Sequence, residues 1–267
     1  MKRGPGYTLA YDARSVLAMA LRTRCRRPDP SASPARRRRV EALRGQVGVT
    51  VGDPMHSWEL EHGAWCRLEP LLSRPEAEAL IRALLSELDW ASRRVVLFGR
   101  SVAEPRLVAW AGALPYRYSG QTLPARAEPP CLRELWERVC AQTGVRFNHV
   151  LANQYRNGGD HMGYHADNEP ELGESPTVAC VSLGAERDFV FRLKMQGHRP
   201  RPDPTRHTVR LPSGSLFVMG GTFQHWYRHA LPPRRRLDAV RVSLTFRKLL
   251  RAPSHLAETK GSQECSW

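Results

Sequence analysis

The 267-residue sequence lacks long apolar runs and closely spaced cysteines. No run of about 18 or more apolar residues occurs, so we expect no transmembrane helix and no membrane partner. The apolar segment 16–21 is short and flanked by arginines, unlike a secretory signal. The six cysteines are scattered without a Cys-x-x-Cys pair, and a chain of this length can hold a core without disulfides. The sequence therefore favours a reduced, intracellular protein over one that spans a membrane or is stabilised by disulfide bonds.

Acidic residues are scarce, and their scarcity is uneven along the chain. The formal net charge is +15, and residues 1–50 supply +9 of it, with one Lys and eleven Arg against three acidic residues. A basic extension followed by a basic domain favours a polyanionic partner, most often nucleic acid. The alternative is a cationic surface that is merely solvated.

Residues 1–50 also lack the apolar residues that a core requires. Their segment RTRCRRPDPSASPARRRR is rich in Arg, Pro and Ser, which is typical of disorder. The run Arg36–Arg39 suits a nuclear localisation signal or a phosphate-binding arm. We therefore divide the chain into a basic, disordered N-terminal extension (1–50), a folded domain (57–250) and a flexible C-terminal tail (251–267).

The folded part combines two amphipathic helices with many short strands. Helical apolar spacing occurs in residues 73–90, behind a Ser73–Glu76 capping box, and in residues 131–142, which end before Gly144. From residue 146 onward, short apolar or alternating runs are predicted as strands, at 147–155, 177–183, 189–194, 208–211, 215–219 and 240–248. This order predicts an α+β fold with a double-stranded β-helix (jelly roll) core and helices packed on one sheet.

The densest group of candidate ligands lies in residues 153–169, NQYRNGGDHMGYHADNE. His165 and Asp167 are one residue apart, so on an extended backbone they share a face, about 7 Å apart. An imidazole and a carboxylate are two-thirds of the two-His-one-carboxylate triad of non-haem Fe(II) enzymes. Our candidate for the third ligand is His225, in GGTFQHWYRH. Since a lone His-x-Asp is common by chance, this interpretation needs a second signal.

The segment RVSLTFR, residues 241–247, supplies that second signal. On a strand, Arg241 and Arg247 share one face with Ser243 and Thr245, and the apolar residues occupy the other. Two arginines on a buried face are costly unless an anion pairs with them, and guanidinium binds carboxylates through paired hydrogen bonds. A dicarboxylate such as 2-oxoglutarate fits this pattern.

The combined pattern NxY…HxD…H…RxSLTFR resembles the AlkB family of Fe(II)/2-oxoglutarate dioxygenases, over roughly residues 95–250. SLGAERDFVFRLK and LFGR are most similar to its vertebrate homologue-two branch, and PRLVAWAGALPYRYSG is equally similar to the homologue-three branch. The resemblance implies Fe(II), 2-oxoglutarate and O2, with ascorbate as reductant. It also implies hydroxylation of a methyl group on a base nitrogen, with release of formaldehyde, succinate and CO2.

Residue roles follow from the same resemblance. For the co-substrate, it implies hydrogen bonds from Asn153 and Tyr155, a grip on the distal carboxylate by Arg247, and Arg241 near the chelating end. Thr245 could add a hydroxyl.

The resemblance also assigns residues to the capture of a flipped base. It implies that Phe98 is an intercalating finger, with a core strand residue as the alternative, and that Tyr118 stacks on the base opposite the ring of His165. Tyr116 and Ser119 would line the pocket, and Glu169 would accept from an exocyclic amino group, with a solvated loop carboxylate as the alternative. Candidate contacts to the DNA backbone are Arg100, Arg234, Arg235 and Arg236, together with the segment 196–206.

These signals predict a nuclear, monomeric DNA-repair dioxygenase that demethylates 1-methyladenine and 3-methylcytosine, preferentially in double-stranded DNA. The alternatives are a homologue-three-like enzyme acting on single-stranded DNA or RNA, a non-catalytic nucleic-acid-binding module, and a protein hydroxylase. A sliding clamp is considered as a partner, although residues 1–50 contain no recognisable clamp-binding peptide.

Overall fold

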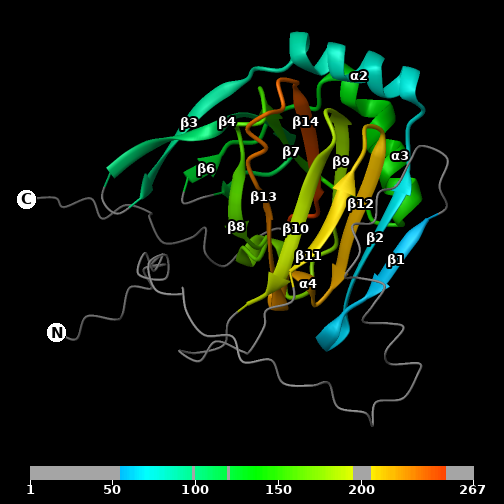
Figure 1. Ribbon diagram of the computed structural model, residues 1–267. Coiled ribbons are helices and arrows are strands. Elements are labelled where there is room, and N and C mark those ends of the chain that lie inside the picture. The colour runs from blue at the N-terminus through cyan, green and yellow to red at the C-terminus, as the bar shows by residue number, and fades with distance from the viewer. Residues whose placement is uncertain (1–54, 98–99, 119–120, 195–205, 251–267) are drawn as a thin grey trace, which may run out of the picture. The chain divides into compact units, whose positions relative to one another are not determined.

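The computed structural model describes residues 55–97, 100–118, 121–194 and 206–250 (Figure 1). Phe98, Ser119, the extension 1–50, the tail 251–267 and most of the basic segment 196–206 lie outside the described residues. The predictions made for them therefore stay predictions.

Fourteen strands in the described residues form three antiparallel sheets. In spatial order, the eight-stranded sheet contains β1 (His56–Glu59), β2 (Ala64–Pro70), β12 (Ser215–Gly221), β9 (Val178–Gly184), β14 (Arg241–Arg247), β7 (His149–Tyr155), β4 (Arg100–Gly112) and β3 (Ala91–Leu97). The four-stranded sheet contains β11 (His207–Leu211), β10 (Arg187–Leu193), β13 (Tyr227–Leu231) and β8 (Met162–His165). A small hairpin is formed by β5 (Tyr116–Tyr118) and β6 (Gln121–Leu123). The large and small sheets are the layers of a jelly roll, and the predicted fold class is confirmed.

Two helices pack on the large sheet, α2 (Arg74–Glu87) and α3 (Arg133–Thr143). Helix α2 begins at the predicted capping box, where the Ser73 amide donates to Glu76 Oε2 at 2.6 Å. Helix α3 ends at Gly144, which adopts a left-handed φ of 71°. The remaining short helices are α4 (Phe223–Trp226), η2 (Glu61–Gly63), η3 (Pro130–Leu132) and η4 (Pro170–Leu172). No helix in the described segments is long and apolar enough to cross a membrane.

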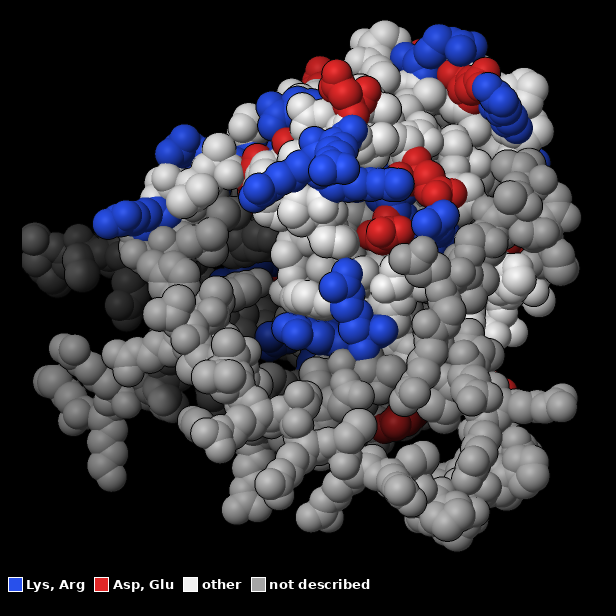
Figure 2. Space-filling model, viewed as in Figure 1, with Lys and Arg blue, Asp and Glu red and all other residues white. Residues whose placement is uncertain are grey.

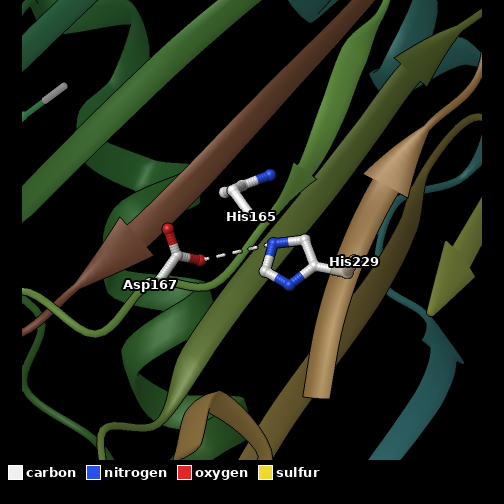
Figure 3. Close-up of side chains that lie close together, drawn as sticks. All are labelled: His165, Asp167 and His229. Atoms are coloured by element: carbon white, nitrogen blue, oxygen red, sulfur yellow. Dashed lines mark ion pairs between the residues drawn. The ribbon is translucent and has the colours of Figure 1, made fainter. Parts of the chain in front are cut away.

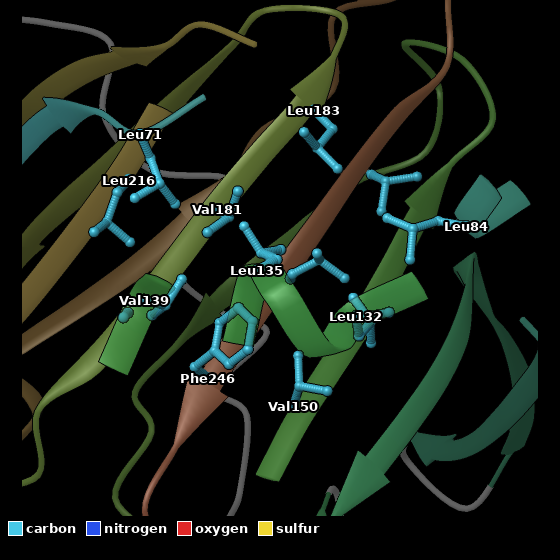
Figure 4. Close-up of a cluster of buried hydrophobic side chains, with 14 of the residues drawn as sticks. Leu71, Leu84, Leu132, Leu135, Val139, Val150, Val181, Leu183, Leu216 and Phe246 are labelled. Atoms are coloured by element: carbon cyan, nitrogen blue, oxygen red, sulfur yellow. The ribbon is translucent and has the colours of Figure 1, made fainter. Parts of the chain in front are cut away.

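The main core lies between the large sheet and these helices (Figure 4). Alternate residues of its central strands point into this core, such as Val181 on β9, Leu244 on β14 and Leu216 on β12, and meet Leu84 of α2 and Leu135 of α3. The intervening residues of the same strands point toward the four-stranded sheet. The large sheet therefore has an apolar, helix-covered face and an inner face that is free to carry polar groups.

The structure also contains strands that the sequence pattern did not predict. Strands β1–β6 precede residue 146, in the part where only helices were predicted, and β8 and β13 were missed as well. Strand β4 contains a proline and alternates buried Glu104 and Arg106 with half-buried Pro105 and Leu107, so its alternation is not apolar and polar. Burial of charged side chains inside the jelly roll explains why the pattern was not recognised.

Candidate metal and co-substrate site

Three side chains that can hold a metal ion converge between the sheets. His165 ends β8, Asp167 follows two residues later, and His229 lies opposite His165 on the neighbouring strand β13. Their ligand atoms all lie within 4.8 Å of one another. Figure 3 shows the three side chains, with His229 Nε2 at 3.6 Å from Asp167 Oδ2. Two imidazoles and one carboxylate are the donor set predicted for a non-haem iron site.

The third member of the cluster is His229, and the predicted His225 lies outside it. His225 lies on the short helix α4, is exposed, and packs its ring against Trp226. Its helical turn directs it away from the cluster, whereas His229 lies on β13, where Tyr227, His229 and Leu231 are buried and Arg228 is exposed. That alternation in YRHAL is the sequence signal that distinguishes the two histidines.

Hydrogen bonds fix the orientation of these ligands. His165 Nδ1 lies 2.9 Å from the carbonyl oxygen of Gly163. Because a carbonyl only accepts, Nδ1 carries the hydrogen and the lone pair is on Nε2. The amide of Asp167 donates to Gln224 Oε1 at 2.9 Å, and Lys194 Nζ donates to the carbonyl oxygen of Gln224 at 2.7 Å. The ligand-bearing loop is thus tied to α4, and α4 in turn to Lys194, the residue after β10.

The electrostatics favour the protonation states that bind a metal. Burial lowers the pKa of His165, and burial with the nearby His165 lowers the pKa of His229 to about 3. Burial alone would raise the pKa of Asp167, but the charge and hydrogen bond of Arg247 outweigh it and hold the pKa below its usual range. Both imidazoles are consequently neutral and the carboxylate is ionised near pH 7, as metal coordination requires.

Two buried arginines of β14 lie in the same region. Arg247 Nη2 donates to Asp167 Oδ1 at 2.7 Å, and Arg241 Nη2 donates to Ser182 Oγ at 2.9 Å. The Arg241 guanidinium also lies 5.4 Å from the centre of the Tyr155 ring. The predicted sharing of one strand face is confirmed, because Val242, Leu244 and Phe246 belong to the helix-covered core instead.

These residues line one cavity between the two sheets. Its lining includes all the predicted co-substrate residues and the three ligands: Asn153, Tyr155, His165, Asp167, His229, Arg241, Thr245 and Arg247. Cys180, Ser243, Met162, Met219, Phe189, Ala230 and Leu231 complete it and were not predicted.

The cavity has the donors that an anionic co-substrate needs. Arg247 Nε and Nη1 and Arg241 Nε are buried and have no hydrogen-bond partner among the described residues. Buried guanidinium groups with unpaired N–H bonds are costly unless an anion binds them. Near these unpaired donors, the neutral imidazoles and the carboxylate fit a divalent cation. The residues present therefore fit both an iron ion and a dicarboxylate.

Residues 65–247 match the family model described as the 2OG-Fe(II) oxygenase superfamily. The chain belongs to this superfamily. Fe(II), 2-oxoglutarate and O2 are accordingly the cofactor and co-substrates of this oxygenase, and together they supply the oxidising chemistry. His165, Asp167 and His229 would hold the metal.

Relatives of this oxygenase confirm the resemblance to the AlkB family. It is 42% identical over 195 residues to the DNA oxidative demethylase ALKBH2 of Mus musculus, covering 70% of this chain and 81% of the relative. It is 39% identical to the Homo sapiens protein of the same name, covering 77% and 81%. With the alpha-ketoglutarate-dependent dioxygenase alkB homolog 3 of Homo sapiens the identity is 36%, covering 67% and 63%.

Two aromatic residues predicted for the base pocket are buried beside this site. Tyr116 and Tyr118 lie on β5 with ring centres 6.0 Å apart, and the Arg247 guanidinium is 5.6 Å from the Tyr116 ring. Glu169 is half-buried, and burial together with the charge of Asp167 raises its pKa. The site thus joins the metal cluster to an aromatic wall through Arg247.

The four arginines predicted individually as backbone contacts are exposed. Arg100 begins β4, and Arg234, Arg235 and Arg236 lie in the loop after β13. That loop is anchored, because the amide of Arg234 donates to the Gly158 carbonyl and the amide of Gly158 donates to the Leu237 carbonyl, both at 2.7 Å. Buried Arg187 also donates to the Pro232 carbonyl at 2.8 Å. The three arginines therefore project from a fixed backbone.

Proposed function

We propose that this oxygenase is a DNA oxidative demethylase that removes methyl groups from 1-methyladenine and 3-methylcytosine, preferentially in double-stranded DNA. The observation that carries the proposal is the cavity that joins the His165–Asp167–His229 cluster to two buried arginines with unpaired N–H groups, beside the aromatic wall of β5. The mouse and human relatives named as DNA oxidative demethylases share 42% and 39% of their aligned residues with this chain. A nuclear location follows from this substrate.

The geometry favours exchanging the roles first predicted for the two arginines. Arg247 contacts the metal ligand Asp167, so it lies at the end of the cavity where a chelating carboxylate would bind. Arg241 pairs with Tyr155 across β14 and β7 and lies over its ring, so it suits the distal carboxylate. Ionised guanidinium groups at both ends orient a dicarboxylate along the strand. Asn153 and Thr245, between them on the same face, can add hydrogen bonds.

The aromatic wall suits a base turned out of a duplex. We assign Tyr118 as the stacking ring, Tyr116 as a pocket residue and Glu169 as an acceptor for an exocyclic amino group. A buried carboxylate and aromatic faces both favour a cationic alkylated base. The Tyr116 hydroxyl and the Glu169 carboxyl interact with each other at the pocket wall, and both are polar groups that can bind a base edge.

The outer face of the four-stranded sheet suits a phosphate backbone. Arg192 on β10 lies directly opposite Arg228 on β13, although like charges in this position repel each other. Figure 2 shows Lys and Arg side chains on this face, interspersed with Asp and Glu. The anchored loop with Arg234, Arg235 and Arg236 follows β13 directly. Such contacts position an enzyme on DNA and make binding salt-sensitive.

The decisive experiment is formaldehyde release from matched 1-methyladenine oligonucleotides, single- and double-stranded, with Fe(II), ascorbate and 2-oxoglutarate. We expect turnover on both and faster turnover on the duplex, and none with His165→Ala. Turnover on single strands alone would instead support an enzyme that acts on single-stranded DNA or RNA. The 36% identity to alkB homolog 3 is the observation that favours this alternative. Oxoglutarate consumption without formaldehyde from either oligonucleotide would refute the proposed substrate.

A further inference from the structure

A buried guanidinium links the co-substrate cavity to the aromatic wall. Arg106 lies on β4, and its side chain has only 7% of its surface exposed. Its Nε donates to Asn153 Oδ1 at 2.9 Å, and its Nη2 donates to the Tyr118 hydroxyl at 3.2 Å. Asn153 lines the metal and co-substrate cavity from β7, whereas Tyr118 belongs to the β5–β6 hairpin. One planar group therefore contacts both sites.

An ion pair keeps this guanidinium charged and in place. Glu104, two residues earlier on the same face of β4, forms an ion pair with it, with Oε1 at 3.1 Å from Arg106 Nη2, and both side chains are buried. Burial lowers the pKa of Arg106, but the neighbouring Tyr118, Tyr155 and Glu104 outweigh it and raise the pKa. A buried pair costs desolvation and adds little net stability. Its position between two binding surfaces suggests a role in function.

The hydrogen bond to Asn153 sets the direction of its amide. Arg106 has no acceptor atom, so the atom of Asn153 that faces it must be the oxygen. The NH2 group of Asn153 then faces away from Arg106 and is available to donate to an oxygen atom in the cavity. Ser243, which lies opposite Asn153 on β14, lines the same cavity.

Tyr118 is held on its other side by a second arginine. Arg93 lies 5.3 Å from the centre of the Tyr118 ring, and its Nη2 donates to Gln121 Oε1 at 2.8 Å. Arg93 thus contacts the ring of Tyr118, and Arg106 holds the hydroxyl end of the same side chain. A shift of Arg106 therefore moves the hydroxyl end and tilts the ring.

Resting on the proposed function, we propose that Arg106 is a positioning residue that couples the co-substrate site to the base site. It directs the Asn153 amide NH2 into the co-substrate cavity and holds the Tyr118 ring with the same guanidinium. Oxoglutarate that binds Asn153 fixes Arg106 and thereby the stacking ring. By reciprocity, a base that stacks on Tyr118 tightens oxoglutarate binding by the same factor.

The test measures the dissociation constant of oxoglutarate by calorimetry, on the full chain loaded with Mn(II) and without O2. Each protein is titrated alone and with a duplex oligonucleotide carrying 1-methyladenine. The ratio of the two constants is the coupling factor, which we expect to be about fivefold or more in the wild type. A merely structural role changes folding but leaves this ratio intact.

Tyr118→Phe keeps the ring and removes the hydroxyl, so we expect oxoglutarate to bind it as tightly as the wild type, with a coupling factor near one. Arg106→Lys cannot reach both partners from one flat group, so we expect about tenfold weaker oxoglutarate binding and no coupling. The matched control is Arg126→Lys, because Arg126 stacks 4.4 Å from the Trp110 ring and lies outside the cavity lining. It should behave as the wild type does.

Wild-type oxoglutarate binding in Arg106→Lys, or wild-type coupling in Tyr118→Phe, would overturn the inference. If Arg106→Lys fails to fold, Tyr118→Phe decides alone. A wild type that binds the oligonucleotide and oxoglutarate without coupling also overturns it, while the proposed function stands. A wild type that binds no oligonucleotide refutes the proposed function, and the affinity of Arg106→Lys for oxoglutarate then decides the role at Asn153.

Discussion

The two faces of the eight-stranded sheet contrast sharply although the same strands form both. On β14 the helix-covered face carries Val242, Leu244 and Phe246, all fully buried among apolar residues of α2 and α3. The inner face of that strand carries Arg241 and Arg247, equally buried but charged. One face stabilises the fold by burying apolar area, and the other leaves donors unpaired. Residues one position apart therefore serve stability and function separately.

The largest expected effect removes a ligand from the inner face. His229→Ala should abolish formaldehyde release and lower the bound Mn(II), because a two-ligand site holds the ion weakly. His225→Ala is the matched control and should retain metal and turnover, since His225 is exposed on α4. Metal content and turnover are measured on both proteins, with circular dichroism as a folding check. Loss of metal in His225→Ala with retention in His229→Ala would reverse the ligand assignment.

Local alternation explains what could be predicted from the sequence. The period of two in RVSLTFR fixed which residues of β14 face the helices, and His165-x-Asp167 gave two ligands in the same way. His225 and His229 could not be separated by their spacing alone. The short helix α4 leaves His225 exposed at the surface. The pairing of β13 with β8, which exists only in the folded chain, brings His229 beside His165.

Arg106 was not predicted because its partners are remote in the sequence. It is 47 residues from Asn153 and 12 from Tyr118, and its strand β4 joins β7 only in the folded sheet. In the sequence, AEPR (residues 103–106) has the pattern of a polar segment interrupted by proline, which does not predict a buried strand. The charge pairing that makes this segment a buried strand depends on the tertiary fold.

The second effect concerns the helix-covered face. Phe246→Ala should lower the free energy of unfolding by about 3–5 kcal/mol, because it leaves a cavity beside Trp136, whose ring centre is 5.4 Å away. While the protein stays folded, the KM for oxoglutarate should be unchanged, since Phe246 points away from the cavity. Urea denaturation gives the first quantity and steady-state kinetics the second. Val102→Ala, at a position 44% exposed, is the control and should change stability by at most about 0.5 kcal/mol. A large change in KM with full stability would contradict the separation of the two faces.

The third effect tests the cost of polar groups on the inner face. His149 on β7 is buried, both of its ring nitrogens have no partner within the described residues, and burial with the charge of Arg247 lowers its pKa from 6.5 to about 3. Between these values the unfolded chain binds the proton and the native state does not, so stability falls as pH drops from 6.5 toward 3. Phenylalanine cannot take up this proton, so His149→Phe should lose up to a few kcal/mol less stability on acidification than the wild type. It should keep the edge contact with Tyr116. Urea denaturation at pH 7 and pH 4.5 compares the two proteins. An equal loss in both would show that His149 takes up no proton on unfolding.

The smallest expected effect lies outside both faces, in the loop that carries Arg234, Arg235 and Arg236. A Cβ on Gly158 would lie 1.9 Å from the Arg234 carbonyl oxygen, so Gly158→Ala must displace this loop. We expect duplex DNA to bind several-fold more weakly, with a shallower salt dependence, because fewer phosphates are neutralised. At Gly159 the nearest atom is 3.1 Å away on the Asn157 side chain, so Gly159→Ala is the matched control. Fluorescence anisotropy at several salt concentrations measures both. An unchanged salt slope in Gly158→Ala would place the phosphate contacts elsewhere, on residues such as Arg192 and Arg228, whose position on the sheet does not depend on the loop.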